Sequence, residues 1–333
     1  MSKETAALHD LIDRFKGRKV AVWGDFILDE YIYGCTQRIS REAPVLILSY
    51  RSREYLLGGA GNALQNLKAL GATPIPVGVI GRDEAGDALL ALLQEHGIRD
   101  TKLFRDAACA TPIKTRILAG EDNTRKQQIL RIDREAYVPD DARLKAKLAA
   151  ALGRLAPSCD ALIVSDYSYR SVRPDVFKSA LPSFRKTDVP VCLDSRFRLL
   201  AFSGVTIATP NEPEVEAALG REVGDSPASV RRAGQDLLSR LRSRALLITR
   251  GSKGMALFEK GKPVLSLPVH GTTDIVDVTG AGDTVISVFG LALASGASFR
   301  QAARLANVAG GLVVMKKGTA TVTPDELRGA IDR

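Results

Sequence analysis

The chain has 333 residues, 45% of them hydrophobic, which is enough for a large core. Its four cysteines are widely spaced and form no C-x-x-C pair, which indicates reduced thiols and argues against a zinc site. No apolar run has the length of a membrane span, and residues 1–19 are too charged for a signal peptide, so we expect a cytoplasmic protein that does not bind a membrane. The net charge of +9 fits a protein that binds either a nucleic acid or a small anion. Nucleic acid is the less favoured partner, because the basic residues suit an anionic substrate equally well and no aromatic residues alternate with them.

The first predicted strand runs from Lys19 to Trp23 and is ended by Gly24. Asp25 and Asp29 follow just beyond its carboxyl end, where open α/β sheets bind ligands. An aspartate after a glycine is also common in turns and caps, so a purely structural role remains an alternative, for Asp29 in particular.

Two insertions, approximately residues 30–57 and 111–133, interrupt the α/β pattern, because their side chains alternate as in strands. The alternating segments are Tyr31–Tyr33, Val45–Tyr50, Ile113–Leu118 and Gln128–Asp133, with a turn expected at Gly120 to Asn123. We expect them to form a small β-sheet that closes over a site as a lid.

The lid is rich in charge. Its candidate substrate-binding residues are Arg38, Arg41, Lys114, Arg116, Arg131 and Asp133, and the five cations among them suit an anionic substrate. Because side chains alternate across a strand, Lys114 and Arg116 share one face, as do Arg131 and Asp133. About half of these cations are expected to be ordinary solvated charges, and two or three that converge would bind a phosphate.

A glycine-rich segment, Gly58 to Asn62 (G-G-A-G-N), precedes leucines at helical spacing and therefore predicts the start of a helix. The amide of Asn62 can exchange hydrogen bonds with sugar hydroxyls at this point. A glycine-rich cap without a ligand is the alternative.

From residue 142 onward, helices and strands alternate, which is typical of βαβ crossovers and a mostly parallel sheet. Each predicted strand ends in polar residues, and these are expected to gather at one edge of the sheet as a site. They are Ser165-Asp166, Asp194, Thr209 to Asn211 and Thr249 to Gly251.

The segment Asp277 to Thr284 (D-V-T-G-A-G-D-T) follows an extended apolar stretch and leads into a helical pattern. Its glycines and Ala281 lie where a helix begins, and the free N–H groups and the dipole favour phosphates there. A carboxylate, Asp283, would repel a phosphate at this position. The role that fits is a general base that deprotonates a hydroxyl attacking a phosphoryl group, and the alternative is a helix cap.

Taken together, Gly58 to Asn62, Thr209 to Glu214 and Asp277 to Asp283, ahead of Ala306-Asn307, resemble the pfkB (ribokinase-type) carbohydrate kinases over nearly the whole chain. The resemblance implies an α/β fold: one ribokinase-like domain over residues 1–333, with a mostly parallel sheet flanked by helices and a β-sheet lid. It also implies an ATP-dependent kinase that uses Mg²⁺. We expect this chain to lack the nucleotidyltransferase domain that is fused to some relatives.

The resemblance assigns roles to individual residues. Asp283 matches the catalytic base, and the amides of Gly280, Ala281 and Gly282 match the hole that stabilises the transferred phosphoryl group. The residues that match the sugar-binding side are Asp25, Asp29, Gly58, Gly59 and Asn62.

On the nucleotide side, the matching residues are Thr249, Arg250, Gly251, Gly254 and Asn307. Asn211 and Glu214 match the segment that positions Mg²⁺ through waters, and Mg²⁺ needs few direct protein ligands. Family members often hold a monovalent cation such as K⁺ beside the positions of Asp277 and Thr279.

Within the family, Gly24 to Asp29, Arg38 to Pro44 and Leu130 to Asp133 most resemble the kinases of D-glycero-β-D-manno-heptose 7-phosphate in lipopolysaccharide core synthesis. Two segments depart from that group: this chain has Tyr169-Arg170 where a lysine usually follows Ser-Asp-Tyr-x, and it has Asp194 to Phe197 (D-S-R-F) where Asp-Pro-Lys-Gly is usual, so that Arg196 takes the place of the lysine. Arg196 can preserve a phosphate contact with changed geometry, or the acceptor is a different sugar.

The alternatives are a kinase for another sugar, a keto-deoxy sugar acid or a nucleoside, and a non-catalytic regulator that binds a sugar or nucleotide. Asp283 favours an enzyme, because a binding protein gains nothing from a carboxylate beside phosphate. The lid insertions are too small to bury their own core, so Val45, Ile47 and Ile113 are expected on an apolar face that pairs with a second subunit in a homodimer.

Overall fold

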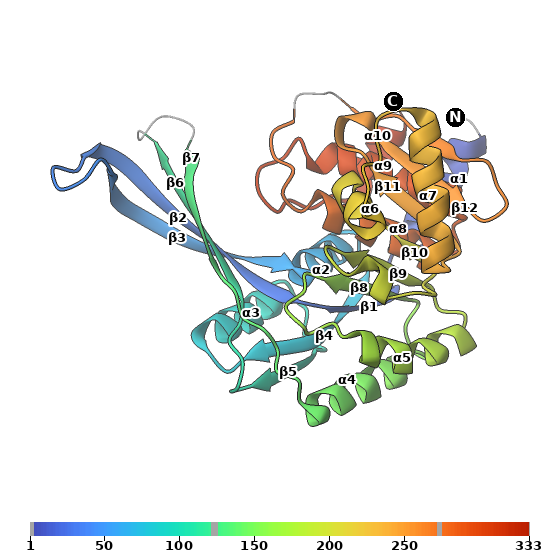
Figure 1. The fold of residues 1–333 in the computed structure, drawn as a ribbon, viewed down its shortest axis with the longest axis horizontal. Coiled ribbons are helices and arrows are strands. Elements are labelled where there is room, and N and C mark those ends of the chain that lie inside the picture. The colour runs from blue at the N-terminus through green and yellow to red at the C-terminus, as the bar shows by residue number, and fades with distance from the viewer. Residues whose placement is uncertain (1–2, 121–125, 272–274, 333) are drawn as a thin grey trace.

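The computed structural model describes residues 3–120, 126–271 and 275–332. Within these ranges the strands form two sheets, and the smaller one projects from the body of the molecule (Figure 1). No helix of the described residues combines the length and apolar composition that crossing a bilayer requires. Most of the turn predicted at Gly120 to Asn123 lies outside the described residues.

The larger sheet has nine strands in the described part of the chain. Their order is β13 (Leu265–Leu267), β12 (Met255–Glu259), β11 (Ala245–Thr249), β10 (Ile207–Ala208), β9 (Val191–Ser195), β8 (Ala161–Asp166), β1 (Lys19–Gly24), β4 (Thr73–Gly81) and β5 (Lys102–Asp106). Neighbours from β11 to β5 are parallel, whereas β12 and β13 are antiparallel. The parallel strands place their carboxyl ends at one edge of the sheet, which the predicted βαβ rhythm requires.

Both faces of this sheet are covered, because its strands are apolar on both sides. On β1, Val20 and Val22 belong to one core, and Ala21 and Trp23 to the other. The first core is closed by α1 (Lys3–Asp13), α2 (Ala60–Ala69), α3 (Glu84–Glu95), α8 (Ala281–Ala294), α9 (Phe299–Val313) and α10 (Pro324–Ile331).

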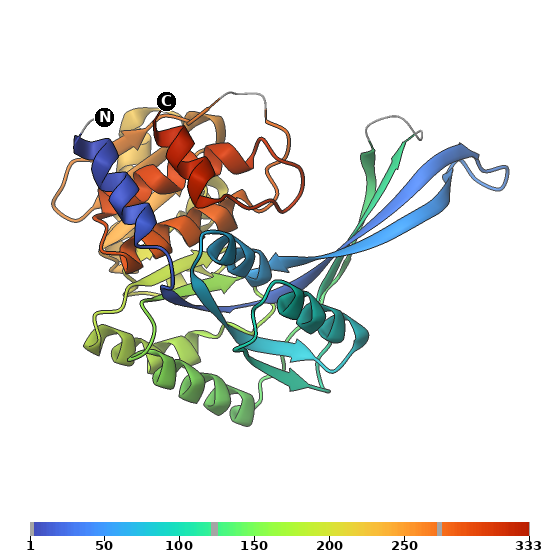
Figure 2. The ribbon, with the colours of Figure 1, turned by 180° about the vertical axis from the view of Figure 1, so that it is seen from behind.

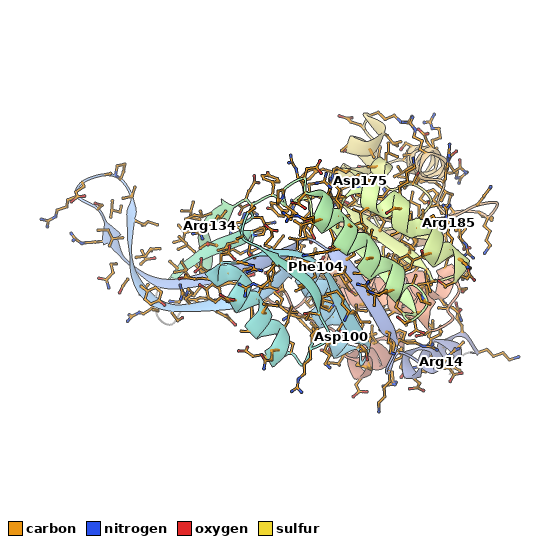
Figure 3. All side chains as sticks on the ribbon, turned by 90° about the horizontal axis from the view of Figure 1, so that it is seen from below. Arg14, Asp100, Phe104, Arg134, Asp175 and Arg185 are labelled. Carbon is orange, nitrogen blue, oxygen red and sulfur yellow. The ribbon has the colours of Figure 1, made fainter. Side chains whose placement is uncertain are left out.

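The second core is closed by α4 (Ala142–Leu155), α5 (Pro174–Lys186), α6 (Glu212–Leu219) and α7 (Pro227–Leu241). Figure 3 views the face that α4 and α5 cover, with Asp175 and Arg185 at opposite ends of α5. Seen from behind, α1 lies beside the C-terminal helices, so both ends of the chain are at the same end of the molecule (Figure 2).

The smaller sheet, called the second sheet below, has the order β3 (Leu46–Gly59), β2 (Phe26–Ile39), β6 (Ile113–Gly120) and β7 (Gln127–Arg134). Strand β2 pairs antiparallel with β3 and parallel with β6, and β6 pairs antiparallel with β7. Only Asp25 separates β1 from β2, so the chain passes directly from the large sheet into the second one.

The sequence reading missed several peripheral elements, among them α1, β5, β12 and α10. It also expected an extended segment ahead of Asp277, of which only Leu265–Leu267 forms a strand and residues 272–274 lie outside the described ranges. The short strand pairs with β12 alone, at the edge of the sheet, where few backbone hydrogen bonds favour a longer one.

Candidate active site

Asp283 lies in the first turn of α8, where only 4% of it is exposed. One carboxylate oxygen accepts a hydrogen bond from Asn62 Nδ2 at 2.9 Å, and the other accepts one from the Tyr167 hydroxyl at 3.0 Å. Burial raises the pKa of Asp283 to about 6, although both hydrogen bonds lower it. A carboxylate that titrates just below neutrality is ionised at pH 7 and can take up a proton readily.

The start of α8 depends on Gly280. Its φ of 78° lies in the left-handed region, and a Cβ added there would lie 2.3 Å from Asn62 Nδ2. Of the amides predicted to form an anion hole, that of Ala281 already donates to the carbonyl of Val278 at 3.2 Å. Gly282 is therefore the better placed donor, and its backbone lines the cavity described next.

A cavity of 430 Å³ adjoins the first turn of α8 on the side of β11. The structure brings six predicted nucleotide-site residues together in its lining: Asn211, Thr249, Arg250, Gly251, Gly254 and Asn307. The remaining lining is largely apolar and includes Met255, Val269, Ile275, Val278, Val285 and Val314. Apolar walls with a few polar groups suit a flat heterocyclic ligand.

Two of these polar side chains are held by neighbours. Arg250 forms an ion pair with Glu212 at 2.7 Å, and Asn307 donates from Nδ2 to the carbonyl of Pro268 at 2.8 Å. Thr249 and Arg250 lie at the carboxyl end of β11, where the parallel strands deliver polar groups. The cavity is thus built at the sheet edge that the strand pattern predicts.

Asn211 and Glu214 have a local structural task in addition to their predicted one. The Asn211 side chain accepts from the Glu214 N–H, and the Glu214 side chain accepts from the Asn211 N–H, both at 2.9 Å, which forms a capping box at the start of α6. Burial raises the pKa of Glu214 and of Asp194, and for Asp194 the nearby carboxylates of Glu214 and Asp283 raise the pKa further. These oxygen ligands and their crowded negative charge fit a hydrated Mg²⁺ ion.

Asp25 has a structural task in addition to the predicted contact with sugar hydroxyls. It is buried, and its carboxylate accepts hydrogen bonds from the N–H groups of Tyr167, Tyr169 and Ser171 at 2.9–3.1 Å. Burial raises the pKa of Asp25 to about 7 in spite of these bonds. The residue holds the loop after β8, because its position between β1 and β2 faces that loop.

Asp29, by contrast, lies on the face of the second sheet that is turned toward Asp283. It raises the pKa of Asp283, and its Oδ1 pairs with Arg116 Nη1 at 2.8 Å. A Cβ added to Gly58 would lie 2.6 Å from an Asp29 oxygen, so the predicted glycine leaves room for this carboxylate. The structure thus brings Asp29, Gly58, Asn62 and Asp283 together.

The register of the second sheet places four predicted residues on that same face. Lys114 is opposite Asp133, and Arg116 is opposite Arg131. Arg131 donates two hydrogen bonds to the Asp133 carboxylate, at 2.9 and 3.0 Å, and is half exposed. Arg116 and Arg131 are therefore both neutralised by a carboxylate.

Lys114 is buried and forms no ion pair within the part of the chain that the structure describes. Burial lowers its pKa, and the nearby Arg196 lowers it further, so the two cations approach each other. Lys114 Nζ lies 5.5 Å from the centre of the Tyr167 ring. An anionic ligand between Lys114 and Arg196 would relieve both the burial and the repulsion.

Arg38 is far from these residues. It is exposed near the end of β2, nine residues beyond Asp29, and at about 3.3 Å per residue this corresponds to about 30 Å. Within one chain the structure does not bring Arg38 to the other predicted site residues, because β2 is much longer than the alternating segment at Tyr31 to Tyr33 indicated. Arg41 follows β2 and is exposed as well.

Asp277 and Thr279, predicted beside a monovalent cation, belong to a loop that is hydrogen-bonded to Gly318. The Asp277 carboxylate accepts from the N–H groups of Thr279 at 2.9 Å and Gly318 at 3.0 Å. Burial tends to raise the pKa of Asp277, but these hydrogen bonds lower it below its ordinary value. The ionised carboxylate thus joins two loops.

A profile of the family described as pfkB family carbohydrate kinase matches residues 18–326. The chain belongs to this family. It is accordingly an ATP-dependent sugar kinase, as the motif resemblance predicted.

The curated relatives include proteins named "Bifunctional protein HldE". That of Geobacter metallireducens is 40% identical over 93% of this chain, and that of Caulobacter vibrioides is 41% identical over 96%. The chain spans 62% and 65% of the length of these two relatives.

Solved structures of the same fold include a ribokinase from Arabidopsis thaliana complexed with ribose and ATP, with a TM-score of 0.72, 20% identity and coverage of 96% of this chain and 99% of that one. A phosphofructokinase-2 from Escherichia coli in complex with substrates and products has a TM-score of 0.76 and 18% identity, covering 95% and 98%. These likenesses confirm the predicted ribokinase-like fold.

Tyr167 is the site residue that the sequence analysis missed. It directly follows Ser165-Asp166, which were singled out as the polar end of a predicted strand. A tyrosine one position further along the same strand end was the available signal. Its contact with Asp283, 116 residues away, depends on tertiary structure alone.

Proposed function

We propose that the enzyme phosphorylates a sugar phosphate, and that its acceptor is D-glycero-β-D-manno-heptose 7-phosphate, converted to the 1,7-bisphosphate. The observation that carries the proposal is the place of Asp283. Its carboxylate lies at the start of α8, between the cavity lined by Gly282 and the face of the second sheet with Asp29 and Lys114. The similarity to HldE proteins and the motifs around Arg38 and Leu130 support heptose as the sugar.

In the proposed reaction, Asp283 takes the proton of the acceptor hydroxyl. The hydroxyl oxygen forms a bond to the terminal phosphorus of ATP while the bond from that phosphorus to the ADP oxygen breaks. The Gly282 amide and the N-terminus of α8 stabilise the charge on the transferred group. Asn211 and Glu214 would hold Mg²⁺ through waters, and the ion would neutralise the nucleotide phosphates.

The acceptor's own phosphate is proposed to bind between Lys114 and Arg196. Arg116 and Arg131 were predicted for this role, but each already has a carboxylate partner. Lys114 is the buried cation without an ion pair in the described residues. Among the neighbouring charges, Arg196 has the largest effect on the pKa of Lys114. Arg116 instead orients Asp29, which is placed to contact a sugar hydroxyl.

A panel of sugars and their phosphates tests this function, with ADP release as the readout. The enzyme is expected to prefer a sugar phosphate strongly over the same sugar without phosphate, and the heptose 7-phosphate over hexose phosphates. Equal efficiency on a sugar and its phosphate would overturn the proposed acceptor class. Preference for a keto-deoxy sugar acid or a nucleoside would replace it.

We further propose that the chain forms one kinase domain, that the second sheet is its lid, and that two copies pair through this sheet. Large apolar side chains on it are 48–65% exposed: Ile39, Val45, Leu46, Tyr50, Leu130 and Ile132. Strand alternation places Leu130 and Ile132 on the face opposite Arg131. Exposed apolar surface of this kind marks an interface, whereas Ile47 and Ile113, also predicted there, are partly buried.

A further inference from the structure

The loop after β8 has an unusual backbone. Ser168 and Arg170 adopt φ values of 68° and 72°, in the left-handed region that residues other than glycine rarely occupy. Asp25 stabilises this shape, since its buried carboxylate accepts the N–H groups of Tyr167, Tyr169 and Ser171. Strained backbone that the surrounding structure holds in place is characteristic of functional sites.

The consequence of this loop shape is the direction of Tyr167. Its hydroxyl donates to one oxygen of Asp283 at 3.0 Å, while Asn62 donates to the other at 2.9 Å. The carboxylate is therefore gripped from two sides, by groups from different parts of the fold. The face of the Tyr167 ring is turned to Lys114 Nζ, 5.5 Å from its centre.

We propose that Tyr167 is a positioning residue: its phenol holds the Asp283 carboxylate in the orientation in which it receives the proton of the acceptor hydroxyl. This inference rests on the proposed function of Asp283 as base. With the phenol absent, Asn62 alone would orient the carboxylate, which could then rotate about its terminal torsion. Binding of ATP does not involve this contact, so the effect falls on the catalytic step.

The test is Tyr167→Phe, which removes the hydroxyl and keeps the ring that packs beside Lys114. The matched control is Tyr169→Phe, in the same loop, whose ring packs against Tyr137 at 5.9 Å. We expect kcat of Tyr167→Phe to fall roughly 10- to 100-fold, the fold-change of one hydrogen bond to a charged group, with the KM for ATP unchanged. Tyr169→Phe should resemble the wild type, as should the melting temperatures of both variants.

A second readout does not require turnover. The charged and titratable groups that face Asp283 are Asp29, Lys114, Tyr167 and Asp194. Because the phenol donates to the ionised form of Asp283, Tyr167→Phe should move the titration of this carboxyl group to higher pH. Carbon-13 NMR of the carboxyl carbon measures the titration, and Asp283→Asn assigns the signal. The acid limb of the rate should move with it.

The outcomes separate the two proposals. If the wild type phosphorylates no sugar or sugar phosphate, the proposed function fails, and the NMR titration still decides whether Tyr167 holds Asp283. If the wild type is active and Tyr167→Phe has the same kcat and the same titration, the positioning role is overturned. An equal loss in Tyr169→Phe would also overturn it, because the effect would then belong to the loop as a whole.

Discussion

Lys114→Met removes the buried charge on the second sheet and keeps most of the side chain's volume. Lys114 makes no ion pair in the described residues, and its pKa is lowered by burial and then by Arg196. In the free enzyme this charge is unfavourable, so we expect the variant to be as stable as the wild type or more stable. With acceptor bound, one charge-assisted hydrogen bond to phosphate contributes about 1.5–3 kcal/mol.

That loss corresponds to a rise of roughly 10- to 100-fold in the KM for a sugar phosphate, with the KM for ATP almost unchanged. Steady-state kinetics at saturating ATP and thermal melting of the free enzyme measure both effects. Arg131→Met is the control, since Arg131 is half exposed and already paired with Asp133, and it should raise the acceptor KM by much less. The reasoning is refuted if Lys114→Met binds the acceptor normally, or if Arg131→Met has the larger effect.

Three further predictions follow from the same geometry. Asp283→Asn should retain nucleotide binding, measured by calorimetry, while turnover falls by roughly 10²- to 10⁴-fold; near-normal turnover in a folded variant would exclude a base at this position. In the wild type, Asp283 must be ionised to act as the base, and its pKa is raised to about 6, so kcat/KM should fall as the pH drops below about 6. A profile of kcat/KM that is flat down to pH 5 would contradict this assignment. Leu130→Asp combined with Ile132→Asp should convert a dimer to a monomer in light scattering without loss of the fold, and a wild type that is already monomeric at micromolar concentration would count against pairing through the second sheet.

Individual residues show how far sequence reasoning reaches. The start of a helix at Gly280 was predicted, because the glycine stands before a helical pattern. The left-handed backbone conformation of Gly280 and its close approach to Asn62 explain why a glycine is required there. The shared face of Lys114 and Arg116 was also predicted, because alternation along a strand is a local property. The assignment of Asp25 and Asp29 was harder, since both follow the same strand and only one is turned toward Asp283.

By itself, the sequence determined much of the alternation of helices and strands, the two insertions that form the second sheet, and the residues at the start of α8, although it missed peripheral elements such as α1, β5, β12 and α10. These features depend on periodicity, glycine positions and strand ends, which neighbouring residues encode. The tertiary structure alone decided which charges are neutralised and which remain open to a ligand. Arg116 pairs with Asp29 across 87 positions, and Tyr167 reaches Asp283 across 116, so no local pattern records either contact. Burial has the same origin: Asp283 and Lys114 have shifted pKa values because elements from distant parts of the chain exclude water around them.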